Sequence, residues 1–179
     1  MSKRKEGTLA ALLEEKRKRG RPKRAVSRKN VYVALSTAQK DQMRQLADTL
    51  PAGLRRSDLP DMAINLLAAR LELLRRAVAD RNREIPEGIT DFDSLYLLWD
   101  LPLARDADAA KWTSIRLSPQ QSVELGRAHG ILNALFGATR SDVFGLSLAL
   151  LAQFMQKEMT SKRYSSIEEV NDWITQIYL

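Results

Sequence analysis

The sequence predicts a mostly α-helical fold assembled from two copies of one unit, a short strand followed by two helices. Three observations lead to this prediction. A segment that starts at Val31 is repeated from Thr113, each strand candidate alternates apolar and polar residues, and each helix candidate follows a residue that commonly caps helices. The repeat governs the fold because one copy alone cannot bury its apolar face.

The two copies match in order and in several short motifs, although the loop between the two helices is longer by two residues in the second copy. The matching motifs are Leu35-Ser36 with Leu117-Ser118, Arg56-Ser57-Asp58 with Arg140-Ser141-Asp142, and Leu66-Leu67-Ala68 with Leu150-Leu151-Ala152. We therefore divide the chain into a tail (1–29), a first repeat (30–83), a linker (84–110), a second repeat (111–160) and a C-terminal helix (161–179).

The first repeat opens with an expected strand over residues 30–36, in which every second residue is apolar. Ser36, with a glutamine three residues later, predicts a capping box and therefore the start of a helix. The Pro-Ala-Gly sequence at 51–53 ends that helix. Ser57 is expected to cap a second helix, which runs to about residue 82.

The second repeat follows the same steps. Its strand places residues 113, 115 and 117 inward, and Ser118 is expected to cap the next helix, with a proline at the first helical position and a glutamine at the box position. Ser141 is expected to cap the last helix of the repeat. Residues 143–155 of that helix are apolar on nearly all sides, which predicts burial at a dimer-like interface.

Positive charge is concentrated in the tail. Residues 1–30 carry 12 Lys/Arg and 3 Glu, a net charge of +9, whereas the other 149 residues carry 17 Lys/Arg and 19 Asp/Glu, a net charge of −2. The tail is dense in charge and poor in apolar residues, so we expect it to be disordered. A basic N-terminal arm is a common device for binding nucleic acid.

The centre of the tail resembles the AT-hook motif. The residues that carry this resemblance are Arg19, Gly20, Arg21, Pro22, Lys23 and Arg24. The resemblance implies that this segment lies along the minor groove of A·T-rich DNA, where the narrow groove concentrates negative potential and attracts arginine. A generic phosphate-binding arm and a nuclear-import signal are the alternative interpretations.

Two regions outside the repeats carry further apolar residues. In the acidic linker, residues 95–99 can form a short helix, which either packs on the repeats or docks a partner. At the end of the chain, Ser165 is expected to cap a helix with Glu168 at the box position. The apolar stripe of that helix predicts packing on the chain's own core, with oligomerisation or recruitment of a protein partner as the alternative.

One strand followed by two helices resembles the ribbon–helix–helix family of Arc- and MetJ-like DNA-binding proteins, over residues 30–76 and 111–158. The resemblance implies that two copies pair their strands in an antiparallel ribbon, which enters the major groove of double-stranded DNA. The outward strand residues would then be the base contacts: Asn30, Tyr32, Ala34, Trp112, Ser114 and Arg116. Ala34 departs from the polar residue usual at its position, so the first copy should read bases weakly.

In this family the start of the second helix binds a DNA phosphate, because a helix N-terminus presents free N–H groups to an anion. The corresponding residues are Arg56, Ser57, Arg140 and Ser141. The repeats have diverged, which favours pairing of the two copies within one chain over pairing between chains in a homodimer. The linker is no obstacle, because about 30 residues reach up to roughly 100 Å.

Catalysis finds no support in the sequence, so we expect a protein that is not an enzyme. The chain has no cysteine and one histidine, and it shows no phosphate-cradling glycine loop, so neither a cofactor nor a metal is expected. An apolar run of the ~20 residues that cross a bilayer is also missing, as is the apolar core of a signal peptide. We expect a cytoplasmic protein that acts on prokaryotic nucleoid or plasmid DNA.

Three functions follow as hypotheses. The first is a sequence-specific transcriptional repressor that acts by occlusion. The second is an accessory DNA protein of a plasmid relaxosome or partition system, since relaxosome accessory proteins with two ribbon–helix–helix copies in one chain are similar in arrangement. The third is an antitoxin-like adaptor that holds a protein partner at 84–110 or 161–179, although antitoxins of this fold usually carry one copy.

Overall fold

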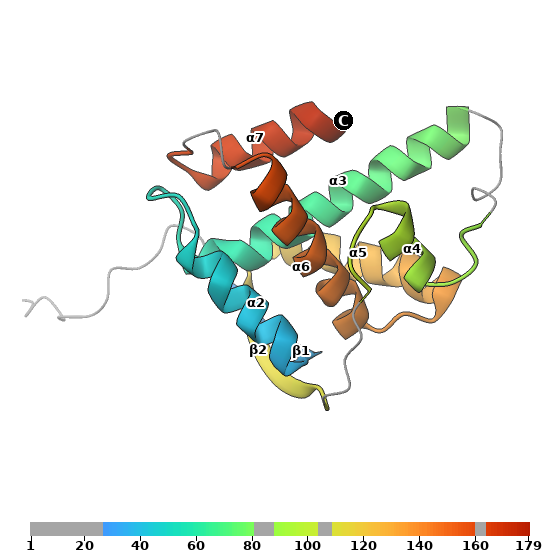
Figure 1. The fold of residues 1–179 in the computed structure, drawn as a ribbon, viewed down its shortest axis with the longest axis horizontal. Coiled ribbons are helices and arrows are strands. Elements are labelled where there is room, and N and C mark those ends of the chain that lie inside the picture. The colour runs from blue at the N-terminus through green and yellow to red at the C-terminus, as the bar shows by residue number, and fades with distance from the viewer. Residues whose placement is uncertain (1–26, 81–87, 104–108, 160–163) are drawn as a thin grey trace, which may run out of the picture.

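A computed structural model describes residues 27–80, 88–103, 109–159 and 164–179 of the chain (Figure 1). The described elements are β1 (Lys29–Leu35), α2 (Thr37–Asp48), the short 3-10 helix η1 (Arg56–Asp58), α3 (Leu59–Asp80), α4 (Asp93–Leu98), β2 (Lys111–Leu117), α5 (Pro119–Phe136), α6 (Arg140–Lys157) and α7 (Ile167–Tyr178). The structure is therefore mostly helical, with one small sheet. The AT-hook-like segment 19–24 lies outside the described residues.

The sheet is an antiparallel ribbon of two strands, β1 and β2, that come from the same chain. Tyr32 pairs with Ser114 at its centre, and Lys29 pairs with Leu117 at one end. The inward residues Val33 and Leu117 are fully buried, because side chains of a strand alternate between its two faces. The alternation read from the sequence is thus present, and the first strand begins one residue earlier than expected.

The core lies behind the ribbon, where α3 and α6 pack against each other (Figure 1). These are the second helices of the two repeats. Leu66 and Leu67 of α3 and Leu146 and Leu151 of α6 are completely shielded from solvent. The apolar character of α6 is explained by this position, because the helix is covered by α2, α3, α5 and β1. The two repeats therefore bury their apolar faces mainly against each other.

Both first helices begin at the predicted serines, but only one capping box closes. Ser36 Oγ accepts a hydrogen bond from the Gln39 backbone N–H (3.1 Å), and Gln39 Oε1 accepts one from the Ser36 N–H (3.1 Å). Ser118 Oγ likewise accepts from the Gln121 N–H at 3.4 Å. The Ser118 N–H, however, donates to Asp61 Oδ1 of α3 at 2.9 Å instead of to the glutamine.

The predicted caps of the second helices are wrong. Helix α6 is capped by Thr139, in a closed capping box with Asp142, so Ser141 lies inside the first turn. In the first repeat, Ser57 lies inside η1, and the Asp58 carboxylate accepts from the Arg55 N–H at 2.9 Å. The matching aspartate, and not the matching serine, takes the reciprocal role in both repeats, because it stands three residues after the true cap.

The linker and the C-terminal segment both pack on the repeats. Leu95, Tyr96 and Trp99, in and next to α4, are buried, and α7 lies against α3. The expected Ser165 cap is wrong by one residue, because Ser166 accepts from the Glu169 N–H.

Among the described helices, no single one is long and apolar enough to cross a membrane; α5 and α6 reach that length and composition only together, bent by 109°.

Candidate nucleic-acid interface

The structure brings the six predicted base-contact residues together on one face of the ribbon. They form three consecutive cross-strand pairs: Asn30 with Arg116, Tyr32 with Ser114, and Ala34 with Trp112. Residues directly opposite one another in an antiparallel pair project on the same side of the sheet. The opposite face carries the buried residues, so the ribbon packs on the core through one face and presents the other outward.

The outward face is open to solvent. The side chains of Tyr32 and Trp112 are 63% and 74% exposed, which is unusual for residues of their size, and Arg116 is also exposed. No described element covers the two aromatic rings. Large exposed aromatic side chains commonly mark contact surfaces, because burying them in a complex removes much apolar area from water at a small cost in side-chain entropy.

A helix start flanks each end of the ribbon. At one end, η1 leads into α3 with Arg56 and Ser57 at the surface. At the other end, Arg140 and Ser141 lie in the first turn of α6. Ser141 Oγ accepts a hydrogen bond from the Ala34 backbone N–H at 2.8 Å, which fastens this helix start to the strand. The Ser141 hydroxyl hydrogen is still available to a second acceptor, because a hydroxyl donates and accepts at once.

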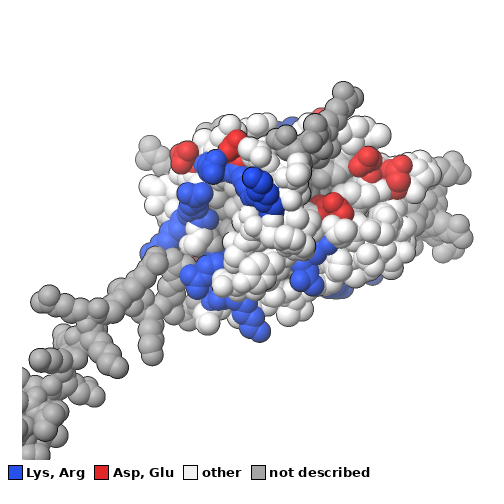
Figure 2. Space-filling view, turned by 90° about the horizontal axis from the view of Figure 1, so that it is seen from below, with Lys and Arg blue, Asp and Glu red and all other residues white. Residues whose placement is uncertain are grey.

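Basic side chains surround this surface. Figure 2 looks at the molecule from below the view of Figure 1, the side of β1 and β2, and shows blue side chains spread over the face, with red ones in its upper half. The exposed basic residues of the ribbon and the two helix starts are Lys29, Arg55, Arg56, Lys111, Arg116 and Arg140. Within the described ranges, none of these six forms an ion pair, so all can meet an anionic partner.

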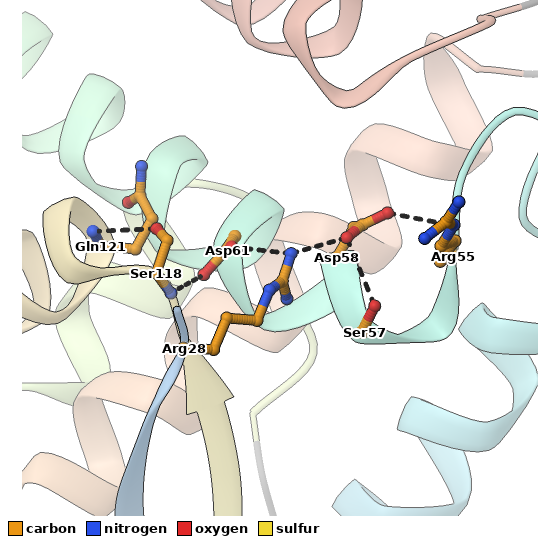
Figure 3. A network of polar contacts seen from close by, with 7 residues as sticks. All are labelled: Arg28, Arg55, Ser57, Asp58, Asp61, Ser118 and Gln121. Atoms are coloured by element: carbon orange, nitrogen blue, oxygen red, sulfur yellow. Dashed lines mark hydrogen bonds and ion pairs between the residues drawn. The ribbon is translucent and has the colours of Figure 1, made fainter. Parts of the chain in front are cut away.

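A largely buried ion network lies behind one end of the ribbon (Figure 3). Arg28, which directly precedes β1, contacts Asp58 Oδ1 at 2.6 Å and Asp61 Oδ2 at 3.1 Å. Its side chain is only 11% exposed. Because Asp61 also accepts from Ser118, the network connects the start of β1, the start of α3 and the end of β2.

Burial raises the pKa of the Asp61 carboxyl above its ordinary value of 3.8, although the hydrogen bond from Ser118 and the charge of Arg28 act in the other direction. Asp61 has a structural role at this end of the ribbon, because its carboxyl group contacts both the Arg28 guanidinium and the Ser118 backbone N–H. Neither Arg28 nor Asp61 was predicted from the sequence to have a role at the ribbon. Arg28 falls within the charged tail, and Asp61 follows a proline in a helix without any motif of its own.

The described residues contain no cluster of three or more His, Asp or Glu that could hold a metal ion. Comparisons of the chain with protein-family models, with curated proteins and with solved structures find no match. The interface combines an exposed two-stranded ribbon, two flanking helix starts and exposed basic side chains.

Proposed function

We propose that this chain is a tandem ribbon–helix–helix protein that binds double-stranded DNA and inserts its β-ribbon into the major groove. One observation carries the proposal: the six outward residues of β1 and β2 form three adjacent pairs on an exposed face between two helix starts. A two-stranded ribbon fits the major groove, which is about 12 Å wide and presents a distinct pattern of donors and acceptors for each base pair.

The ribbon carries side chains suited to reading bases. The Arg116 guanidinium can donate two hydrogen bonds to guanine, and the Asn30 amide can pair with adenine in the same bidentate manner. The two residues are opposite each other in the ribbon, so they would meet neighbouring base pairs. Tyr32 and Trp112 are suited to contacts with thymine methyl groups or sugars.

The helix starts are suited to holding the DNA backbone. The start of η1, which leads into α3, and the start of α6 each carry an exposed arginine, Arg56 and Arg140. The positive dipole end of a helix start favours an anion such as a phosphate. Phosphate contacts of this kind fix the orientation of a protein on the duplex and carry no sequence information. The basic tail would add further contacts to phosphates or to the minor groove.

Repression by occlusion is the simplest role for such a protein. An accessory role on plasmid DNA would use the same interface. An antitoxin-like adaptor would need a docking surface, and the exposed Leu97 and Leu98 of α4, together with Leu103, are described apolar residues of the linker that suit one. Footprinting on the DNA upstream of its own gene separates the first role from the others, because a repressor commonly protects its own promoter.

Substitution of Arg116 tests the proposed reading of bases. Arg116→Ala should weaken binding to the best DNA site by about 1–3 kcal/mol and should affect random DNA much less. Lys157→Ala is a matched control, because this exposed lysine ends α6, about 25 Å along the helix from its start. Equal decreases in affinity for specific and random duplexes would show that Arg116 does not read sequence. Failure of the natural protein to bind any DNA duplex would refute the proposed DNA binding itself.

Deletion of residues 1–26 tests the tail. The shortened protein keeps Arg28 and the whole ribbon, so its fold should persist. We expect weaker binding to specific and random DNA alike. The dependence of log K on log salt concentration should also become shallower, by nearly one unit for each phosphate that the tail neutralises in the full chain. An unchanged salt slope would mean that the tail does not bind DNA.

A further inference from the structure

The two ends of the ribbon differ, although the repeats place them at equivalent positions. We call the end next to Arg28 the Arg28 end, with Asn30 and Arg116, and the opposite end the Ser141 end, with Ala34 and Trp112. Positions 82 residues apart are equivalent in the two strands, so Asn30 corresponds to Trp112 and Arg116 corresponds to Ala34. A homodimer would present the same residues at both ends.

Hydrogen-bonding capacity lies at the Arg28 end. There the paired side chains are an amide and a guanidinium, each able to recognise one base through two hydrogen bonds. At the Ser141 end the pair consists of a methyl group and an indole. Neither offers a bidentate contact to a base edge, and the Ala34 backbone N–H is already bound to Ser141.

The tail leaves the folded body at the Arg28 end as well. Arg28 is held by Asp58 and Asp61, so the residue that follows the tail is fixed beside the start of α3 (Figure 3). Arg24 is three residues from Ser27 and Arg19 is eight, which limits their reach to about 10 Å and about 30 Å from that point. The Ser141 end lies ~20 Å from that point, the length of the seven-residue strand, and is therefore beyond the reach of Arg24. The segment 19–24 cannot lie as a whole on the flank beyond the Ser141 end.

We propose that the protein binds an asymmetric DNA site, in which sequence is read in the half facing the Arg28 end and the tail segment 19–24 contacts only the flank beyond that same end. This inference rests on the proposed DNA-binding function. The inference adds a polarity to that function. The Ser141 end holds DNA through phosphate and apolar contacts, and this end contributes little sequence information.

The polarity is tested with the full chain on its best site, by changing each base pair in turn and measuring Kd. We expect Kd to rise about 5- to 150-fold for critical positions in one half. Changes in the other half should raise Kd less than about threefold, because phosphate contacts do not discriminate bases. In the Arg116→Ala variant, base-pair changes in the sensitive half should raise Kd less than they do in the natural protein, and changes in the other half should have the same effect as before.

The position of the tail is tested by cleavage from a tethered reagent. The natural chain has no cysteine, so Ala25→Cys in the tail, two residues before Ser27, and Ala52→Cys in the exposed loop before η1 each give one attachment point. Both proteins should cleave DNA on one and the same flank, next to the sensitive half. An A·T-rich block on that flank should tighten binding, whereas the same block on the other flank should not.

Three results would overturn the inference. These are equal base-pair sensitivity in both halves, cleavage from Ala25→Cys on both flanks, and cleavage from the two attachment points on opposite flanks. Each of them leaves specific DNA binding intact, so the failure of the polarity is distinguishable from the failure of the proposed function. Absence of binding to every duplex would refute both.

Discussion

Ser36 and Ser118 occupy equivalent positions and begin equivalent helices, yet their backbone N–H groups are satisfied in different ways. The Ser36 N–H donates to Gln39, within the same helical turn. The Ser118 N–H donates to Asp61, which belongs to the second helix of the other repeat. One helix start is therefore stabilised locally, and the other depends on tertiary structure.

The residue facing each cap explains the difference. Positions 84 residues apart are equivalent in the second helices, so the counterpart of Asp61 is Gly145. A Cβ atom at Gly145 would lie only 2.5 Å from Gln39 Nε2, so the glycine gives the Gln39 side chain its room. On the other side Asp61 accepts the hydrogen bond of the Ser118 N–H, and the buried Gln121 side-chain oxygen has no hydrogen-bond partner among the described residues.

Repeated sequence thus does not guarantee repeated interactions. The glutamine is present at both box positions, but its effect depends on whether an aspartate or a glycine faces it. Because Asp61 also holds Arg28, the tertiary cap belongs to the same network that fixes the root of the tail. Substitutions at the two caps test this contrast, and the largest effect is expected at Asp61.

Asp61→Ala should destabilise the fold by about 3 kcal/mol, since it leaves a buried arginine with one partner and a backbone N–H with none. Chemical denaturation followed by circular dichroism measures this change. Asp41→Ala is the control, because Asp41 forms an exposed ion pair with Arg44 that should contribute well under 1 kcal/mol. Destabilisation of similar size in the two variants would contradict the structural role of Asp61.

Replacement of the two box glutamines by methionine should have opposite effects. Gln39→Met removes the acceptor of the Ser36 N–H and should cost about 1 kcal/mol. Gln121→Met removes a buried oxygen that has no partner in the described part of the chain and should stabilise the fold by about 1 kcal/mol, because methionine has a similar shape. Thermal and urea unfolding of both variants measure the signs. Destabilisation by both would mean that Gln121 has a partner in solution.

Gly145→Ala should couple to Gln39. In the natural chain the new methyl group displaces the Gln39 side chain, which offsets the gain of up to about 1 kcal/mol expected for alanine in a helix. In the Gln39→Ala background this conflict is absent, and the gain should appear. A double-mutant cycle measures the coupling. Equal effects of Gly145→Ala in both backgrounds would show that the two residues do not compete for space.

The raised pKa of Asp61 predicts a pH effect with a defined sign. A carboxyl group whose pKa is higher in the folded state takes up a proton there first, so its contribution to stability increases as pH falls through that pKa. The difference in unfolding free energy between the natural protein and Asp61→Asn should thus change in favour of the natural protein on acidification. A change in the opposite direction would mean that pairing with Arg28 dominates over burial.

Comparison with Asp61→Asn is needed because other carboxylates act in the opposite sense. Hydrogen bonds from Arg75 and Arg76 lower the pKa of the exposed Glu72 to about 2. Its stabilising contribution is present above its ordinary pKa of 4.5 and disappears as pH falls toward 2. That decrease occurs equally in both proteins, so it cancels in the difference.

The local part of this architecture was predictable from the sequence. The alternation around Val33 and the box at Ser36 involve neighbours within a few residues, and both are present. The predicted caps Ser57 and Ser141 are wrong because neighbouring residues can each act as a cap, and the aspartate that follows decides between them. Arg28 and Asp61 were not predictable, because their partners lie 30 and 57 residues away.

The pairing of β1 with β2 has a consequence for synthesis of the chain. Lys29 pairs with Leu117 and Leu35 with Lys111, which are separations of 88 and 76 residues. At about 5–20 residues per second, the first strand waits roughly 4 to 16 s on the ribosome for its partner. During that interval its edge and the apolar side of α3 are uncovered, so nascent chains are candidates for chaperone binding. A chain that ended before residue 111 would lack β2, α5 and α6, so β1 and the apolar side of α3 would have no partner from the second repeat.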